Sequence, residues 1–234
     1  KITIDNKPIT GRAGMTVLEA AKMADIYIPT LCYHPALTPF GACRLCIIEI
    51  EGMRGFPTSC TTPVNDGMVI KTNTPQLQEL RRGILELTIT DHPYNCITCP
   101  TNGRCELQKV AANIGMKEIT LPYIYEKRPV YRNDPFFDRD YNMCILCGRC
   151  VRICHEVRGA TAITFTKRGI KTVIGTAFGR PLQESGCQFC GACVDACPTG
   201  ALTERAREWA GLADREVVTT CPYCGVGCQL SLQL

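Results

Sequence analysis

The sequence of 234 residues has no long hydrophobic run, and its net charge is small. No apolar stretch approaches the about 18 residues that a membrane span requires, so we expect no transmembrane helix. The first residues, KITIDNKPITG, contain neither the basic nor the apolar region of a secretory signal. The excess of 26 basic over 22 acidic side chains is too small to indicate a nucleic-acid surface. We therefore expect a cytoplasmic protein.

The sequence also lacks the glycine-rich loops that bind nucleotide phosphates. Neither GxGxxG nor a P-loop pattern occurs. The chain is therefore expected to contain no NAD or ATP site of its own. Its candidate functional residues are metal ligands, and no catalytic residue is predicted.

Cysteine, in contrast, is abundant, with 18 residues in the chain. In short secreted proteins such a density indicates a disulfide scaffold. Without an export signal, a reducing cytosol keeps thiols free, and dense cysteine then indicates metal binding. Metal clusters, rather than one large apolar core, are expected to organise much of the chain.

The first 75 residues predict a small α+β unit. ITIDNKPIT alternates apolar and polar residues around a turn-forming Asp-Asn pair, which is typical of a hairpin. Thr16 and Glu19 form a capping box that predicts a short helix. The segments IIEIEG (47–52) and MVIKT (68–72) are predicted to be strands.

A second helix is predicted to begin at Thr74, as its N-cap, with Pro75 in the first turn. Its core-facing side chains are predicted from helical spacing to be Leu77, Leu80, Ile84 and Leu87. A further helix is predicted over 106–116. LPYIYEKRPVYRNDPFF is expected to be irregular, TAITF and IKTVIGTAF to be strands, and RAREWAGLADREVV (205–218) to be a polar helical connector.

A repeated run carries the strongest functional signal. CILCGRCVRIC (144–154) and CQFCGACVDAC (187–197) share the spacing C-x2-C-x2-C-x3-C. Two-cluster ferredoxins use this spacing, followed by proline, and the fourth cysteine of each run ligates the other 4Fe–4S cluster. Pro198 follows the second run, whereas His155 follows the first. The predicted ligand sets are Cys144, Cys147, Cys150 and Cys197 for one cluster, and Cys187, Cys190, Cys193 and Cys154 for the other. A pair of zinc sites is the alternative.

Another group has the spacing C-x10-C-x2-C-x13-C and consists of Cys32, Cys43, Cys46 and Cys60. Four thiolates in a small α+β unit suit a 2Fe–2S cluster, although plant-type spacing begins C-x4-C. A zinc knuckle is the alternative. His34, which precedes a proline, is predicted to be a turn residue rather than a ligand.

A histidine precedes the next group, which has the spacing H-x3-C-x2-C-x5-C and consists of His92, Cys96, Cys99 and Cys105. Three close cysteines need a fourth ligand, and His92 is the candidate nearby. Imidazole can replace thiolate in iron–sulfur centres and tends to raise their potential. A lone histidine here would be a helix-end residue, but beside three cysteines we predict that His92 is the fourth metal ligand.

The last motif, TTCPYCGVGCQLSLQL, places Cys221, Cys224 and Cys228 at C-x2-C-x3-C spacing. No Cys, His, Asp or Glu follows them. From its residues alone the motif is therefore a metal site without a fourth ligand in this chain.

Residues 1–116, with C-x10-C-x2-C-x13-C and then H-x3-C-x2-C-x5-C, resemble the N-terminal part of the large iron–sulfur subunit of respiratory complex I. The resemblance implies a β-grasp domain with a 2Fe–2S cluster and then a His/Cys-ligated 4Fe–4S domain. The same pair of domains occurs in NAD-linked formate dehydrogenases and in multisubunit iron-only hydrogenases.

Two features favour the formate dehydrogenases among these relatives. The double-cluster module at 144–197 fits them and the hydrogenases better than complex I, whose equivalent region usually carries one cluster. VVTTCPYCGVGCQL resembles the motif that opens the molybdenum- or tungsten-bis-pterin oxidoreductase domain. In that family the three tail cysteines ligate a 4Fe–4S cluster together with a downstream cysteine.

The expected fold is therefore α+β, in four parts. They are a 2Fe–2S ferredoxin-like β-grasp domain (1–75), a His/Cys 4Fe–4S domain (76–120), a double 4Fe–4S ferredoxin-like domain (121–208) and the truncated start of a molybdopterin oxidoreductase domain (209–234). The expected cofactors are one 2Fe–2S cluster and three 4Fe–4S clusters, with a fourth 4Fe–4S cluster at the tail if its last ligand is present.

The resemblance implies an electron relay within a cytoplasmic formate dehydrogenase. Formate oxidation or CO2 reduction would occur at a molybdenum or tungsten pterin centre outside this chain, and electrons would exchange with a flavin- and NAD-binding partner subunit. A free-standing iron–sulfur subunit of a hydrogenase or diaphorase complex is the second hypothesis. A structural or storage zinc protein is the third.

Overall fold

The computed structural model describes residues 1–205, 213–222 and 225–234. The helices are α1 (Val17–Met23), α2 (Pro75–Ile89), α3 (Glu106–Ile114), α4 (Arg149–Arg152) and α5 (Ala192–Asp195). The strands are β1 (Ile2–Ile4), β2 (Lys7–Ile9), β3 (Glu49–Ile50), β4 (Val69–Lys71), β5 (Val130–Tyr131), β6 (Phe137–Asp140), β7 (Thr164–Thr166), β8 (Val173–Gly175), β9 (Leu202–Glu204), β10 (Glu216–Thr220) and β11 (Gln229–Gln233). A π-helical turn, Ile153–Val157, extends α4.

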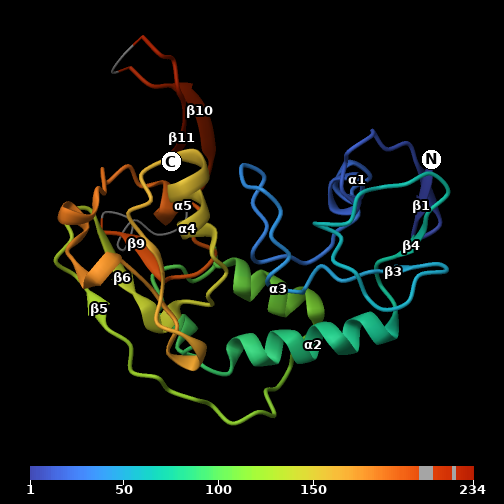
Figure 1. The fold of residues 1–234 in the computed structure, drawn as a ribbon, viewed down its shortest axis with the longest axis horizontal. Helices are drawn as coiled ribbons and strands as arrows, with labels where there is room; N and C mark the ends of the chain where they lie inside the picture. The colour runs from blue at the N-terminus through green and yellow to red at the C-terminus, as the bar shows by residue number, and fades with distance from the viewer. Residues whose placement is uncertain (206–212, 223–224) are drawn as a thin grey trace.

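The elements form an elongated molecule (Figure 1). The N-terminal unit with β1, β3, β4 and α1 lies at one end, and α2 and α3 run beneath the centre. The unit with β5, β6, β9, α4 and α5 lies at the other end, and the β10–β11 hairpin extends away from it. Among the described residues, no helix combines the length and apolar character needed to cross a membrane.

The N-terminal unit is a four-stranded mixed sheet in the order β2-β1-β4-β3. The β1–β2 pair is the predicted hairpin, and its turn residues Asp5 and Asn6 have φ of 47° and 65°. Two successive residues with positive φ match the right-handed twist of the strands. The central β1–β4 pairing is parallel, as the β-grasp prediction requires, with Thr3 opposite Val69.

Helix α1 begins with the predicted capping box. The Oγ1 atom of Thr16 accepts from the Glu19 backbone N–H at 3.3 Å, and Glu19 Oε2 accepts from the Thr16 backbone N–H at 2.8 Å. The helix thereby satisfies two N–H groups that would otherwise lack partners. Its buried residues, Val17, Leu18, Ala20 and Ala21, pack in one core with the inward residues of the sheet.

Helix α2 begins as predicted, because Thr74 Oγ1 accepts from the Leu77 backbone N–H at 3.2 Å. The predicted buried face is correct for Leu77 and in part for Ile84, whereas the side chains of Leu80 and Leu87 are exposed. The buried residues are Leu77, Arg81, Leu85 and Ile89. Arg81 can lie in the core because its guanidinium donates to the backbone carbonyls of Leu45 and Ile47, at 3.0 and 2.8 Å.

Helix α3 ends before the predicted limit of residue 116, because Gly115 adopts a left-handed conformation (φ 68°) that terminates it. The buried side chains of α3 are Leu107, Val110 and Ile114. They form a second core with Leu85 and Ile89 of α2 and with Leu31 and Leu45 of the first unit. Helices α2 and α3 are therefore joined to the N-terminal unit by packing.

The remaining strands form small sheets. The predicted strand TAITF overlaps β7 at Thr164 and Phe165, and IKTVIGTAF contains β8. The two strands pair antiparallel with Phe165 opposite Ile174. The stretch LPYIYEKRPVYRNDPFF (121–137), which was expected to be irregular, contains β5 and the first residue of β6. The expectation is wrong for those residues. Strand β6 pairs with both β5 and β9, and this pairing between distant segments has no local sequence signal.

The last described residues form the β10–β11 hairpin, with Glu216 opposite Gln233. The helical connector predicted over 205–218 is wrong for residues 216–218, which lie in β10. Valine and threonine dominate this strand, and β-branched side chains favour extended backbone. Residues 206–212 of the predicted connector lie outside the described part of the chain.

Candidate metal centres

The first cysteine group lies in loops beside the N-terminal sheet. Cys32, Cys46 and Cys60 are buried, and the sulfurs of Cys46 and Cys60 are 3.4 Å apart. The Cys43 backbone N–H donates to Cys32 Sγ at 3.4 Å. The structure thus brings together all four predicted ligands, Cys32, Cys43, Cys46 and Cys60.

Two of these thiols are strongly acidified by their neighbours. The hydrogen bond with Cys32 lowers the pKa of Cys43 to about 5 and raises that of Cys32. The hydrogen bond with Cys60 lowers the pKa of Cys46 to about 7 and raises that of Cys60. The thiolate is the form that ligates a metal, so Cys43 and Cys46 are the two thiols of this group that ionise first. His34 lies apart from this role, since its Nδ1 accepts from the Ala36 backbone N–H at 3.2 Å in the predicted turn.

The second group surrounds a cavity of about 230 Å³ that is lined by His92, Cys96, Cys99 and Cys105. His92 is 9% exposed, and burial lowers the pKa of its imidazole, which favours the neutral form. Its buried Nδ1 has no hydrogen-bond partner among the described residues. A neutral, unpartnered imidazole nitrogen at a cavity with three cysteines is suited to metal ligation.

The segment after Cys197 closes this second site. The carbonyl of Pro198 accepts from the Glu106 backbone N–H at 2.9 Å and lies 3.6 Å from Cys105 Sγ. A Cβ atom on Gly200 would lie 3.0 Å from Cys99 Sγ, so a side chain there would crowd this sulfur. The His92 site and the end of the second ferredoxin-like run therefore share a wall.

The third group combines residues from both ferredoxin-like runs. A cavity is lined by Cys144, Cys147, Cys150 and Cys197. Burial, together with the neighbouring Cys197, raises the pKa of Cys144 to about 11 and that of Cys147 to about 12. This placement of Cys197 beside the first run is the crossing that the repeat predicts.

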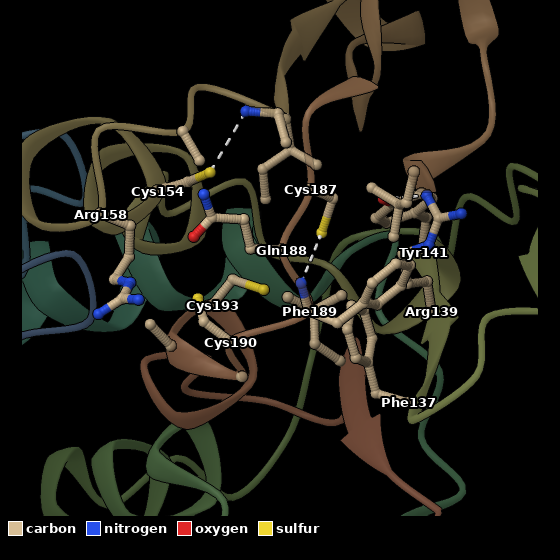
Figure 2. Close-up of a pocket in the computed structure, with 17 residues that line it drawn as sticks. Phe137, Arg139, Tyr141, Cys154, Arg158, Cys187, Gln188, Phe189, Cys190 and Cys193 are labelled. Atoms are coloured by element: carbon tan, nitrogen blue, oxygen red, sulfur yellow. Dashed lines mark hydrogen bonds between the residues drawn. The ribbon is translucent and has the colours of Figure 1, made fainter. Parts of the chain in front are cut away.

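The fourth group shows the reciprocal crossing (Figure 2). Cys154 of the first run lines a pocket with three cysteines of the second run, which are Cys187, Cys190 and Cys193. Burial, together with the other three cysteines, raises the pKa of Cys193 to about 12. Buried thiols of this kind become thiolates when a metal centre supplies compensating positive charge.

The two runs use the same backbone device to direct hydrogen bonds at sulfur. Leu146 and Phe189 occupy equivalent positions and have positive φ, of 52° and 50°. Their backbone N–H groups donate to Cys144 Sγ and Cys187 Sγ, each at 3.4 Å. Hydrogen bonds to ligand sulfurs raise the reduction potential of an iron–sulfur cluster. The two cysteine runs therefore share this hydrogen bond as well as their spacing.

The tail motif is described in part. The Cys221 backbone N–H donates to the Cys228 carbonyl at 2.7 Å and closes the end of the β10–β11 hairpin. Cys224, the third predicted ligand of this motif, lies outside the described residues.

The four complete sets fit iron–sulfur clusters by their donor chemistry. Each set offers soft thiolates around a pocket or buried contact, and the second adds a buried imidazole without a partner in the described part of the chain. Among the described residues, no three His, Cys, Asp or Glu side chains converge closely enough to hold a single metal ion. A cluster is larger than an ion, and its ligands surround an iron–sulfide core.

Sequence reasoning missed several charged residues at these sites. Arg149 and Arg152 flank Cys150, and Glu106 follows Cys105. Their contacts cross between units, because Arg149 pairs with Glu106, and Arg152 donates to the carbonyl of Cys32. The placement of arginines between ligand cysteines in CGRCVRIC was a signal available in the sequence, but their acceptors lie far away along the chain.

Three family models match successive parts of the chain. Residues 1–75 match a 2Fe-2S iron-sulfur cluster binding domain, and residues 81–120 match the NADH-ubiquinone oxidoreductase-G iron-sulfur binding region. Residues 134–203 match the ferredoxin-like domain of NADH-quinone oxidoreductase subunit 3. The predicted fold class, with ferredoxin-like 2Fe–2S, 4Fe–4S and further ferredoxin-like domains in an α+β chain, is confirmed.

Individual relatives agree with these matches. The NADPH-Fe(3+) oxidoreductase subunit alpha of Geobacter sulfurreducens is 41% identical over 234 residues, which cover 98% of this chain and 27% of the relative. The NADP-reducing hydrogenase subunit HndD of Solidesulfovibrio fructosivorans is 42% identical over 215 residues, which cover 89% of this chain and 36% of the relative.

A solved structure is also similar. A chain in the crystal structure of NAD+-reducing [NiFe]-hydrogenase in the H2-reduced state matches with a TM-score of 0.78 and 35% sequence identity, over 88% of this chain and 87% of that chain. The present chain spans 27% to 36% of the length of the two curated relatives above, but most of that hydrogenase chain. It belongs to the family of iron–sulfur subunits of NAD(P)-linked oxidoreductases, which includes the NADH-ubiquinone oxidoreductase-G proteins and related hydrogenase subunits.

Proposed function

We propose that the chain is an electron relay built from four iron–sulfur clusters. The clusters would supply one-electron transfer, and the protein holds, buries and spaces them. The proposed 2Fe–2S ligands are Cys32, Cys43, Cys46 and Cys60. The proposed 4Fe–4S ligand sets are His92 with Cys96, Cys99 and Cys105; Cys144, Cys147 and Cys150 with Cys197; and Cys154 with Cys187, Cys190 and Cys193.

The observation that carries this proposal is the gathering of four separate ligand sets into one packed structure. Only a few residues separate neighbouring ligand sets. Pro198 and Gly200, which follow the ligand Cys197, lie against Cys105 and Cys99 of the His92 set. The carbonyl of Cys32 is joined to Arg152, which lies between Cys150 and Cys154. These contacts fix the spacing between sites, which is what a chain of one-electron carriers requires.

We further propose the domain division 1–75, 76–120, 121–208 and 209–234. The first two boundaries are supported by the family matches at 1–75 and 81–120. Helix α2 begins at Pro75 and carries Arg81 back into the first unit. The first two domains would therefore behave as a joined pair.

The finer function that we propose is electron relay in a formate dehydrogenase. Its support is the tail motif of Cys221, Cys224 and Cys228, together with the double-cluster module at 144–197. In the full-length protein these three cysteines would hold a further 4Fe–4S cluster beside a molybdenum or tungsten pterin centre. Electrons from formate would then pass to a flavin- and NAD-binding partner subunit.

A second candidate is an iron–sulfur subunit of a hydrogenase or NAD(P)H-linked complex without a pterin site. The similarity to the hydrogenase chain, with a TM-score of 0.78 over most of both chains, favours this candidate. The NADP-reducing hydrogenase subunit, at 42% identity, also favours it.

Anaerobic reduction of the full-length protein by different donors distinguishes the two candidates. For a formate dehydrogenase, metal analysis finds molybdenum or tungsten, and formate bleaches the cluster absorption. In Cys221→Ser, formate should no longer reduce the remaining clusters at the parent rate, whereas dithionite still should. Absence of both metals, with bleaching by H2 or NAD(P)H but not by formate, would establish the second candidate.

A further inference from the structure

Arg149 is a buried cation in the contact between three of the proposed cluster sites. It occupies the first position of α4, directly before Cys150, and its side chain is only 5% exposed. A charged side chain is rarely buried unless other groups compensate for its lost hydration. The groups around Arg149 therefore indicate what its charge does.

One compensating group is Glu106, which holds Arg149 in a two-point ion pair. Arg149 Nη1 donates to Glu106 Oε1 at 2.6 Å, and Nη2 donates to Oε2 at 2.8 Å. Burial opposes the charge on Arg149, but this pairing holds the pKa of its guanidinium above the usual value. Glu106 follows Cys105, so the pair spans the second and third cluster sites.

The ion pair with Glu106 leaves one nitrogen of the guanidinium without a hydrogen bond in the described part of the chain. Arg149 Nε is buried and has no hydrogen-bond partner among the described residues. Cys147 and Cys32 are both within electrostatic reach of Arg149. Arg149 lies between Cys147 and Cys150 in the sequence, and its ion-pair partner Glu106 follows Cys105. The buried charge therefore lies beside proposed cluster ligands.

We propose that the fixed positive charge of Arg149 raises the reduction potential of the cluster at Cys144, Cys147, Cys150 and Cys197. The inference rests on the proposed cluster sites. Reduction adds one negative charge to a cluster, and a nearby buried cation stabilises that added charge with little screening by salt. Glu106 acts in the opposite direction, and its 43% exposed side chain is better screened than the buried guanidinium.

Arg152, three residues further along the same segment, has a different task. Its guanidinium donates to the carbonyls of Thr38 and Cys32 and stacks over the Phe40 ring at 5.0 Å. These contacts clamp the 32–40 loop of the first domain onto α4. The Nε atoms of both arginines are buried without a partner among the described residues, so the two differ in what the rest of the guanidinium contacts. Arg152 binds backbone carbonyls and is a structural cation, whereas Arg149 pairs with a carboxylate.

The test is an EPR-monitored redox titration of the cluster-loaded protein carrying Arg149→Gln, Arg149→Lys or Glu106→Gln. At the midpoint potential of the parent protein, the reduced-to-oxidised ratio of the cluster at Cys144, Cys147, Cys150 and Cys197 should fall roughly tenfold in Arg149→Gln. A tenfold fall corresponds to a potential that is about 59 mV lower for a one-electron couple. Arg149→Lys retains the charge and should recover most of this ratio. Glu106→Gln removes the opposing charge and should raise the ratio.

Arg205→Gln is the matched control, because Arg205 also pairs with a carboxylate, Asp138, but its side chain is 42% exposed. It should leave all potentials unchanged. The inference is overturned if Arg149→Gln loads its clusters without a shift, or if Arg149→Lys shifts as far as Arg149→Gln. If Arg149→Gln fails to load clusters, the test is the reduced-to-oxidised ratio in Glu106→Gln. A raised ratio supports the inference, and an unchanged or lowered ratio overturns it.

Iron and sulfide content separates this inference from the proposed function. Parent protein without iron and sulfide would refute the cluster sites themselves. Parent protein with the expected clusters, but with potentials that do not respond to Arg149 or Glu106, would refute the charge effect alone.

Discussion

At the scale of single residues, His92 shows how a sequence pattern and a structural observation complement each other. The spacing before three cysteines predicts it as a ligand, and the structure places its buried ring, unpartnered among the described residues, at their cavity. The sequence could not predict Gly200, whose missing side chain permits the approach to Cys99 Sγ. That approach joins segments about a hundred residues apart, so no local signal marks it.

His92→Cys tests the proposed ligation. A thiolate adds negative charge where a neutral imidazole stood, so one 4Fe–4S centre should shift to a lower reduction potential while the others stay unchanged. Redox titration followed by EPR measures this shift. His34→Ala is the control, because His34 lies in a turn and should affect no potential. An unchanged set of potentials in His92→Cys would remove His92 as a ligand.

At the scale of elements, α2 shows where periodicity misleads. Its beginning was predictable, because the Thr74 cap and Pro75 act within one turn. Its buried face was only partly predictable, because counting apolar residues selects Leu80 and Leu87 and rejects Arg81. The core accepts Arg81 through the carbonyls of Leu45 and Ile47, which become acceptors only after the first domain has folded.

Arg81→Met should destabilise the contact between α2 and the first domain. The change keeps much of the side-chain volume but leaves two buried carbonyls without their donor, at a cost of roughly 3 kcal/mol. The measurement is the thermal midpoint of the loaded protein under anaerobic conditions, which should fall by several degrees. Arg82 is adjacent and exposed, so the thermal midpoint of Arg82→Met should stay near that of the parent protein. Equal thermal midpoints for the two variants would contradict the role of Arg81.

Other elements follow the same division between local and distant causes. The β1–β2 hairpin and the α1 capping box depend on neighbouring residues and were predictable. Strand β6 depends on pairing with β9, more than sixty residues later, and was expected to be irregular where it begins. Strand β10 is paired with β11, which overrides the helical prediction for residues 216–218.

At the scale of the whole molecule, the units meet at the proposed cluster sites rather than through one continuous core. Leu37 of the first domain packs with Ile153 and Ala196 beside Cys193. Arg152 and Arg149 make polar contacts from the same segment to the first and second domains. Ligand spacing predicted the four sets, and the contacts that order them in space emerged from the folded structure.

Iron and acid-labile sulfide counting, combined with EPR of the reduced 234-residue chain, tests the central claim most directly. The account predicts one 2Fe–2S centre and three 4Fe–4S centres, or about 14 iron and 14 sulfide per chain. Zinc in place of iron and sulfide would contradict it, as would a fully loaded protein whose spectra lack the 2Fe–2S centre or any one of the three 4Fe–4S centres.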